Sequence, residues 1–202
     1  MRLRFPCAIA LSILTSCAGQ TTAPSFVDRG SETTAPPPPR LQVDPATLTP
    51  TTSYTISFSA LRENKAPVTT HLESGFTVAA VSGNWIALTT YGNPQPFIEF
   101  NSAAGTTVTG EVRVTAGSSP FWLNSVDFYS STTKIPYVIE GFLAGEERFA
   151  VVDVIGNTFG AFARRPNPNA NLVVDEVRLR LSNPSAPCCA NPMGVDNIVV
   201  SR

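Results

Sequence analysis

The chain has 202 residues, of which 14% are charged, and its formal net charge of −1 becomes −3 if Arg2 and Arg4 leave with a cleaved leader. A weakly acidic chain without a basic stripe has no electrostatic basis for binding nucleic acid. The length allows one domain or two small ones. Plentiful Thr, Ser, Pro, Val and Ala is typical of an extracytoplasmic β-rich protein rather than a cytosolic helical enzyme.

The first residues have the pattern of an export signal. A positive start is followed by an apolar stretch over residues 5–14, which is too short for a membrane-spanning helix of about 20 residues. Leu14-Thr15-Ser16-Cys17 resembles the lipobox of bacterial lipoproteins. The resemblance implies cleavage before Cys17 and acylation of Cys17, which would anchor the protein in the membrane. The alternative is an ordinary secretory signal with a coincidental cysteine.

Residue 18 is Ala rather than Asp, and by the same resemblance this favours the outer membrane in a Gram-negative cell. Residues 18–50 are rich in Thr, Pro, Ala and Ser and include four consecutive prolines at 36–39. Such a segment buries too little apolar surface to fold, and its prolines favour an extended polyproline II form. We therefore predict a signal peptide (1–16), a lipidated cysteine with a flexible tether (17–50) and a folded domain (51–202).

Short β patterns separated by turn residues fill the rest of the chain. In the clearest, Val177, Leu179 and Leu181 alternate with charged residues, as in a strand with one buried face. Residues 82–84 (Ser-Gly-Asn) are predicted to form a tight turn between two strands. No window has a convincing helical repeat. Strands are predicted at 54–59, 76–81, 85–89, 97–100, 107–115, 121–129, 135–143, 147–155, 171–181 and 195–200, which indicates a sandwich or barrel.

Five segments in sequence order carry a family resemblance. They are 73–78 (Glu-Ser-Gly-Phe-Thr-Val), 92–94 (Gly-Asn-Pro), 125–128 (Ser-Val-Asp-Phe), 138–141 (Val-Ile-Glu-Gly) and 194–200 (Gly-Val-Asp-Asn-Ile-Val-Val). Over residues 54–202 the chain resembles the jelly-roll domain of bacterial proteins with PEP-CTERM sorting signals and, more distantly, galactose-binding-like carbohydrate-binding sandwiches. This implies an all-β, antiparallel jelly-roll β-sandwich of about ten strands. The hydrophobic C-terminal helix of the PEP-CTERM pattern does not follow, so we expect the N-terminal lipid to replace that anchor.

The resemblance also implies a structural calcium ion, because galactose-binding-like sandwiches often hold one with an acidic residue at the start of the last strand. Asp196, the carbonyl group of Asn197 and Glu73 are the candidate ligands, and calcium requires six to eight oxygens. The first predicted strand lacks the acidic residue that these relatives usually place there. The alternative is that Asp196 accepts hydrogen bonds from turn amides.

Aromatic side chains are the candidate ligand-binding residues, because the apolar faces of sugars stack on flat rings. Tyr91, Trp85 and Trp122 are the candidates, with burial in the core as the alternative for each. Tyr91 is the strongest because a Gly-Asn-Pro loop follows it. The adjacent Cys188 and Cys189 are compatible with a vicinal disulfide, with free thiols or with pairing between chains.

No catalytic group stands out. His71 is the single histidine and is expected in a solvated loop; there is no nucleophile elbow and no zinc-ligand spacing. The sequence thus predicts a non-enzymatic, exported and lipid-anchored binding module for carbohydrate or another envelope component. The alternatives are a structural or adhesive protein that binds protein partners through loops or sheet edges and, less favoured, a hydrolase.

Overall fold

The computed structural model describes residues 49–102, 108–183 and 190–202, all within the unit Gln42–Arg202. These residues form strands and loops, and none of their segments is a helix long and apolar enough to cross a membrane. The strands are β1 (Ser53–Ile56), β2 (Thr70–Glu73), β3 (Phe76–Ser82), β4 (Ile86–Leu88), β5 (Phe97–Ser102), β6 (Val108–Thr115), β7 (Trp122–Ser130), β8 (Ile135–Leu143), β9 (Glu146–Ile155), β10 (Ala163–Pro166), β11 (Glu176–Asn183) and β12 (Asn191–Ser201).

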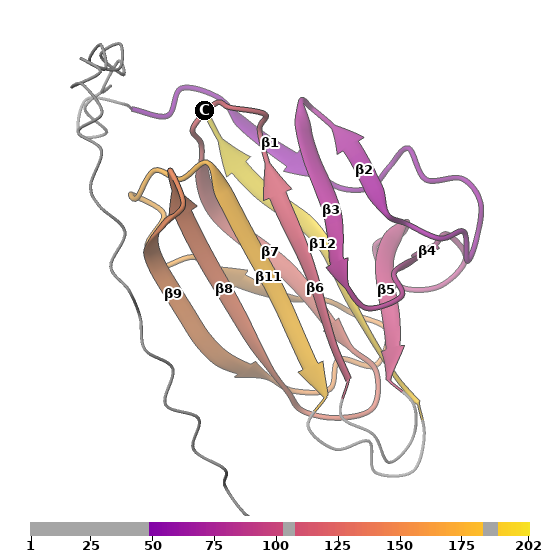
Figure 1. Ribbon diagram of the computed structural model, residues 1–202. Helices are drawn as coiled ribbons and strands as arrows, with labels where there is room; N and C mark the ends of the chain where they lie inside the picture. Colours follow the sequence, from indigo (N-terminus) through magenta and orange to yellow (C-terminus); the bar gives the residue numbers. More distant parts are fainter. Residues whose placement is uncertain (1–48, 103–107, 184–189) are drawn as a thin grey trace, which may run out of the picture. The chain divides into compact units, whose positions relative to one another are not determined.

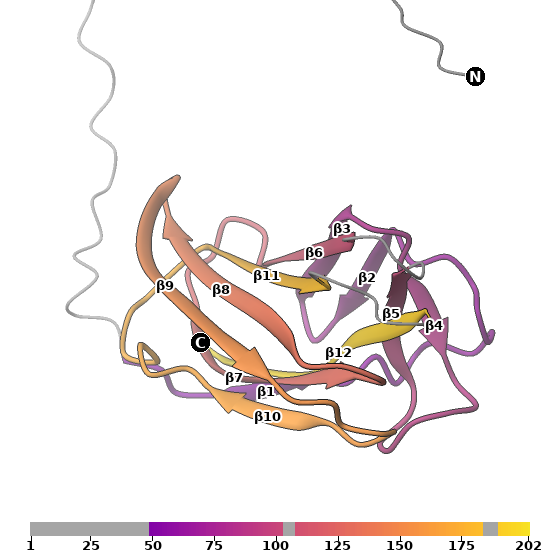
Figure 2. The same cartoon turned by 90° about the horizontal axis from the view of Figure 1, so that it is seen from below.

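The strands form two six-stranded antiparallel sheets that face each other (Figures 1 and 2). In the first, here called the β12 sheet, the order is β10-β7-β12-β5-β4, and β1 pairs with the far end of β12. In the second, the β11 sheet, the order is β2-β3-β6-β11-β8-β9. The prediction of an all-β antiparallel sandwich is therefore confirmed.

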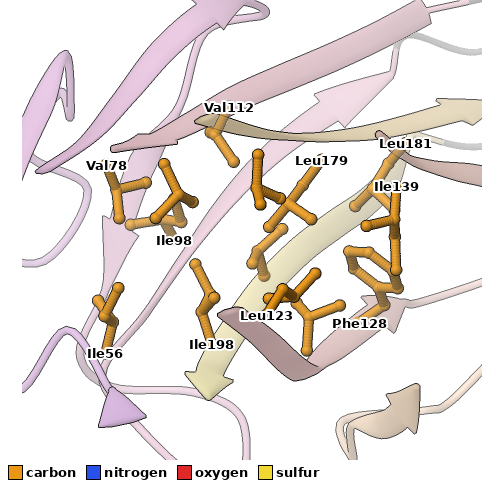
Figure 3. Packing of buried hydrophobic residues seen from close by; sticks show 14 of the residues in the cluster. Ile56, Val78, Ile98, Val112, Leu123, Phe128, Ile139, Leu179, Leu181 and Ile198 are labelled. Atoms are coloured by element: carbon orange, nitrogen blue, oxygen red, sulfur yellow. The ribbon is translucent and has the colours of Figure 1, made fainter. Parts of the chain in front are cut away.

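The core lies between the two sheets, where buried aliphatic and aromatic side chains from both point toward one another (Figure 3). In β11 the side chains of Val177, Leu179 and Leu181 are fully buried, as the alternating pattern predicts. Burial of such side chains contributes about 1.5–3 kcal/mol each. Because Gln42–Arg202 contains this core and both sheets, it has the property that allows a domain to fold independently.

The outer face of the β11 sheet is polar at its centre. The Arg180 guanidinium on β11 bridges Glu111 on β6 (2.8 Å) and Glu140 on β8 (3.2 Å). Partly exposed ion pairs of this kind contribute little to stability individually. Their geometry follows from the charged residues that alternate with the buried positions of β11, so this face is the solvated side of the sheet.

Three sequence predictions need correction. The Ser82–Asn84 segment does not connect two paired strands, because β3 belongs to the β11 sheet and β4 to the β12 sheet. The short strands β2 and β10 were not predicted, since each has four residues and several polar side chains. The strand predicted at 147–155 begins earlier, because β9 opens at Glu146, and the hairpin turn before it contains Ala144 and Gly145, both with positive φ.

Several predictions concern residues outside the described ranges. Cys17, the signal peptide and nearly all of the tether precede residue 49, and Cys188 and Cys189 lie in the segment 184–189. Lipidation and the vicinal disulfide therefore stay predictions.

Candidate functional site

Tyr91 lies on the loop between β4 and β5 and is 51% exposed. Its ring stands edge-on against that of Tyr129, with centroids 6.5 Å apart. A Cβ atom added to Gly160 would lie 3.2 Å from the Tyr91 hydroxyl oxygen, so the phenol rests close to that backbone. Tyr91 thus contacts the protein at Tyr129 and at the Gly160 backbone while much of the ring is open to solvent.

A second exposed aromatic residue, Phe159, lies on the loop between β9 and β10 and was missed by sequence reasoning. It is 77% exposed and has a positive φ of 49°, which is uncommon for a residue other than glycine. The loop is tied to the Tyr91 loop by the Asn93 amide, which donates to the Gly160 carbonyl over 3.1 Å. The available signal was Phe inside a Gly-Asn-Thr-Phe-Gly turn, where a large apolar side chain has no core to enter.

Beneath Tyr91, the outer face of the β12 sheet holds a second apolar cluster, separate from the main core. Phe97 and Tyr129 are fully buried in it, and Phe162 packs on both with ring centroids 5.0 and 5.6 Å away. Burial raises the pKa of Tyr129 to about 12. We call Tyr91, Phe159 and this supporting cluster the Tyr91 surface.

Three carboxylates lie on the same outer face, and only Asp127 has a strong partner. The Arg164 guanidinium donates to both Asp127 oxygens, at 2.9 and 3.3 Å, and Asn197 donates to one of them at 3.0 Å. Glu99 is 6% exposed and accepts only a long 3.5 Å hydrogen bond from Asn101 within the described residues. Burial raises the pKa of Glu99 to about 7, against smaller opposing contributions from Asn101 and Lys65.

Asp196 is 1% exposed, and its Oδ1 has no hydrogen-bond partner among the described residues. Its cross-strand partner in the β7–β12 register is Asp127, next to a β-bulge. Burial raises the pKa of Asp196 to about 7; the Asn197 amide opposes this, while the charges of Asp127 and Glu73 add to it.

Glu73, the third candidate calcium ligand, is already engaged by protein groups. Its oxygens accept hydrogen bonds from Ser57 (3.0 Å) and the Phe58 amide (2.8 Å), and one lies 2.9 Å from Nε2 of His71. Burial alone would raise the pKa of Glu73, but these hydrogen bonds together lower it. In residues 49–102, 108–183 and 190–202 there is no group of three or more His, Cys, Asp or Glu side chains suited to one ion. Calcium binding stays a prediction.

His71 differs from its expected place in a solvated loop. It lies in β2, is 6% exposed and packs its ring 5.0 Å from that of Phe58. The prediction of a solvated histidine was wrong because a short polar strand gave no sign that it covers one end of the core.

The two tryptophans are buried. Trp85 is 3% exposed, donates from Nε1 to the Ser82 carbonyl over 2.7 Å and packs 4.7 Å from Phe100. A shallow cavity of about 280 Å³ between Pro67 and Gly83 reaches Trp85, but little of the indole surface is exposed there. Trp122 is 5% exposed. Of the three predicted aromatic candidates, Tyr91 alone presents a ring that a ligand can cover without rearrangement.

The three carboxylates on the outer face of the β12 sheet do not form an accessible hydrolytic pair. Glycoside hydrolysis needs two carboxyl groups that face one bond across a cleft. Glu99 and Asp196 are almost fully buried, and Asp127 is neutralised by Arg164.

The chain matches no protein-family model and no curated protein. Among solved structures it is similar to a DUF4465 family protein from Bacteroides caccae, at 10% identity and a TM-score of 0.49, over 74% of this chain and 99% of that one. It is also similar to a family 29 carbohydrate-binding module from Piromyces equi, at 12% identity and a TM-score of 0.45, over 74% and 89%. A mutant family 29 module complexed with mannohexaose is 20% identical, with a TM-score of 0.44, over 74% and 91%. These likenesses are remote, and no site residue is transferred from them.

Proposed function

We propose that this protein is a non-catalytic binding module that holds carbohydrate on the Tyr91 surface. The observation that carries the proposal is the half-exposed ring of Tyr91, supported by Tyr129 on one side and by the Gly160 backbone beneath its hydroxyl. A ring held in this way loses little conformational freedom when a sugar stacks on it, which favours binding.

Phe159 extends the surface. Its loop is hydrogen-bonded both to the Tyr91 loop, through Gly160 and Asn93, and to β7, where the Thr158 amide donates to the Ser130 carbonyl over 2.8 Å. Two exposed aromatic side chains on adjoining, mutually tied loops fit a chain of sugar residues better than a single small molecule. We therefore expect an oligosaccharide or polysaccharide ligand, presented to an exported protein at the cell envelope.

The test is a polysaccharide and glycan binding screen with the Gln42–Arg202 unit, followed by titration of any ligand found. Tyr91→Ala should weaken binding about tenfold or more, since stacking on one aromatic ring contributes on the order of 1–2 kcal/mol. Tyr91→Phe should retain most of the affinity because the ring remains. Phe142→Ala is the matched control, since Phe142 is a partly buried aromatic residue on the β11 sheet, where Arg178 covers its ring at 4.7 Å.

Two outcomes would count against the proposal: no glycan binds, or a bound glycan is held equally well by Tyr91→Ala. In either case the alternative function, a structural or adhesive protein, would be better supported than carbohydrate binding.

A further inference from the structure

Arg164 on β10 adjoins the Tyr91 surface and presents its charged end to solvent. Its side chain is 60% exposed, yet Nε donates to one Asp127 oxygen over 2.9 Å and Nη2 donates to the other over 3.3 Å. Asn197 also donates to the second of these oxygens, at 3.0 Å. Because Asp127 is only 6% exposed, a buried carboxylate fixes the orientation of an exposed guanidinium group.

Strand pairing places Arg164 in line with the aromatic rings of the surface. Arg164 lies opposite Asp127 in the β10–β7 register. Phe162 and Tyr129 each lie two residues from this pair, and their ring centroids are 5.6 Å apart. Side chains two residues apart share one face of a strand, so the ion pair directly follows the two packed rings on the outer face. A chain of sugar residues stacked on Tyr91 can therefore extend across Phe162 to Arg164.

The guanidinium group of Arg164 has a free edge that is suited to sugar hydroxyl groups. A guanidinium carries five N–H groups in one plane, and Asp127 occupies the edge between Nε and Nη2. The edge between Nη1 and Nη2 has no partner in the part of the chain that the structure describes. It offers two parallel N–H groups, which fit two acceptors side by side. Adjacent hydroxyl groups of a sugar ring supply such a pair of oxygens.

The charges around Arg164 favour an uncharged sugar over an acidic one. Asp127 already neutralises Arg164, and two more carboxylates, Glu99 and Asp196, lie on the same outer face. Lys65 offsets only part of the charge of Glu99. A sugar carboxylate on the free edge would place a second anion on one guanidinium, with no unpaired positive charge to offset its lost hydration. Hydroxyl groups lose less hydration and accept the same two hydrogen bonds.

We infer that Arg164 is the polar specificity residue of the Tyr91 surface, where its free edge binds adjacent hydroxyl groups of an uncharged glycan. The inference rests on the proposed carbohydrate binding and adds the chemical class of the ligand. Asp127 is a positioning residue, because its carboxylate orients the guanidinium and cancels the attraction for anionic sugars. The site therefore selects neutral polysaccharides over those that carry uronic acid groups.

The experiment is titration of the Gln42–Arg202 unit with a glycan bound in the screen and with the same glycan after oxidation of its primary alcohols to carboxylates. Mannan and polymannuronate are the first such pair. The wild type should bind the neutral form about tenfold or more tightly than the oxidised form, and salt should change the neutral affinity little. Arg164→Lys should weaken binding of the neutral form about tenfold or more, because an ammonium group lacks two parallel N–H groups.

Further variants separate ligand binding from folding. Arg164→Met combined with Asp127→Asn leaves no unpaired buried charge and should weaken neutral binding as much as Arg164→Lys does. Asp127→Asn alone should narrow the difference between the neutral and oxidised forms, because the charge of Arg164 is no longer cancelled; a structural defect would not do this. Arg178→Lys is the matched control: Glu176 holds the Arg178 Nε at 2.7 Å beside the Phe142 ring on the β11 sheet, and binding should be unchanged.

The inference is overturned if the oxidised form binds as tightly as the neutral one, or if the glycan found in the screen is itself acidic. It also fails if either Arg164 variant keeps wild-type affinity or if Arg178→Lys is equally damaging. In these cases weaker binding by Tyr91→Ala would still support the proposed function, whereas a screen without any bound glycan would overturn both. Circular dichroism and thermal unfolding establish that each variant is folded.

Discussion

Replacing Asp196 by Asn should stabilise the protein at neutral and alkaline pH. Asp196 is 1% exposed with one unpartnered carboxylate oxygen, and its pKa is raised from the ordinary 3.8 to about 7 by burial. Below about pH 4 the carboxyl group is protonated in the folded and the unfolded chain and has no effect on pH dependence. Between about pH 4 and 7 it ionises only in the unfolded chain, so stability falls as the pH rises.

Above about pH 7 the carboxyl group is ionised in the folded and the unfolded chain. The loss of folding stability caused by its burial is then at its maximum and no longer changes with pH. A pKa difference between 3.8 and about 7 corresponds to at most about 4 kcal/mol, at about 1.36 kcal/mol for each pKa unit. Asn keeps the shape of the side chain, but it carries no charge beside Asp127. We therefore expect Asp196→Asn to be more stable than the wild type at about pH 8 and nearly equal to it at about pH 4.

The assay is urea unfolding of both proteins across this pH range in the presence of a chelator. Glu146→Gln, at an exposed position on β9, is the control and should shift stability equally at both ends of the range. The reasoning is refuted if the difference in free energy of unfolding between Asp196→Asn and the wild type is the same at about pH 8 as at about pH 4. Repeating the assay with calcium tests the calcium prediction, since an ion held by Asp196 would stabilise the wild type above about pH 7 and not the variant.

Two further predictions concern the core and the leader. Leu179→Ala should lower the free energy of unfolding by about 2–5 kcal/mol, because Leu179 is fully buried. Leu72→Ala, at a site 70% exposed, should change it by less than about 0.5 kcal/mol. Similar urea midpoints for the two variants would contradict this prediction. Cys17→Ser in the full chain should abolish incorporation of labelled fatty acid and release the protein from the membrane fraction, while Cys7→Ser should have no effect; labelling that survives Cys17→Ser would disprove lipidation at this residue.

The sequence predicted strands best where one face of the strand enters the core. In β11 the alternation of Val177, Leu179 and Leu181 with charged residues follows from the two-residue period of a strand. β2 and β10 have no such pattern because they are short edge strands, and β10 is held by pairing with the distant β7. The turn at Ser82–Asn84 shows a further limit: turn residues mark where the chain bends, but they do not specify whether the flanking strands pair or enter different sheets.

The candidate site was only partly predictable for a related reason. Tyr91 could be identified because the residues after it form a turn that cannot bury a phenol. Trp85 is of a residue type that often binds sugars, but its side chain lies buried in the core. The unusual environments of Glu99 and Asp196 depend on strand register. Asp196 lies opposite Asp127 only because β7 and β12 are neighbours, and no local pattern encodes that pairing.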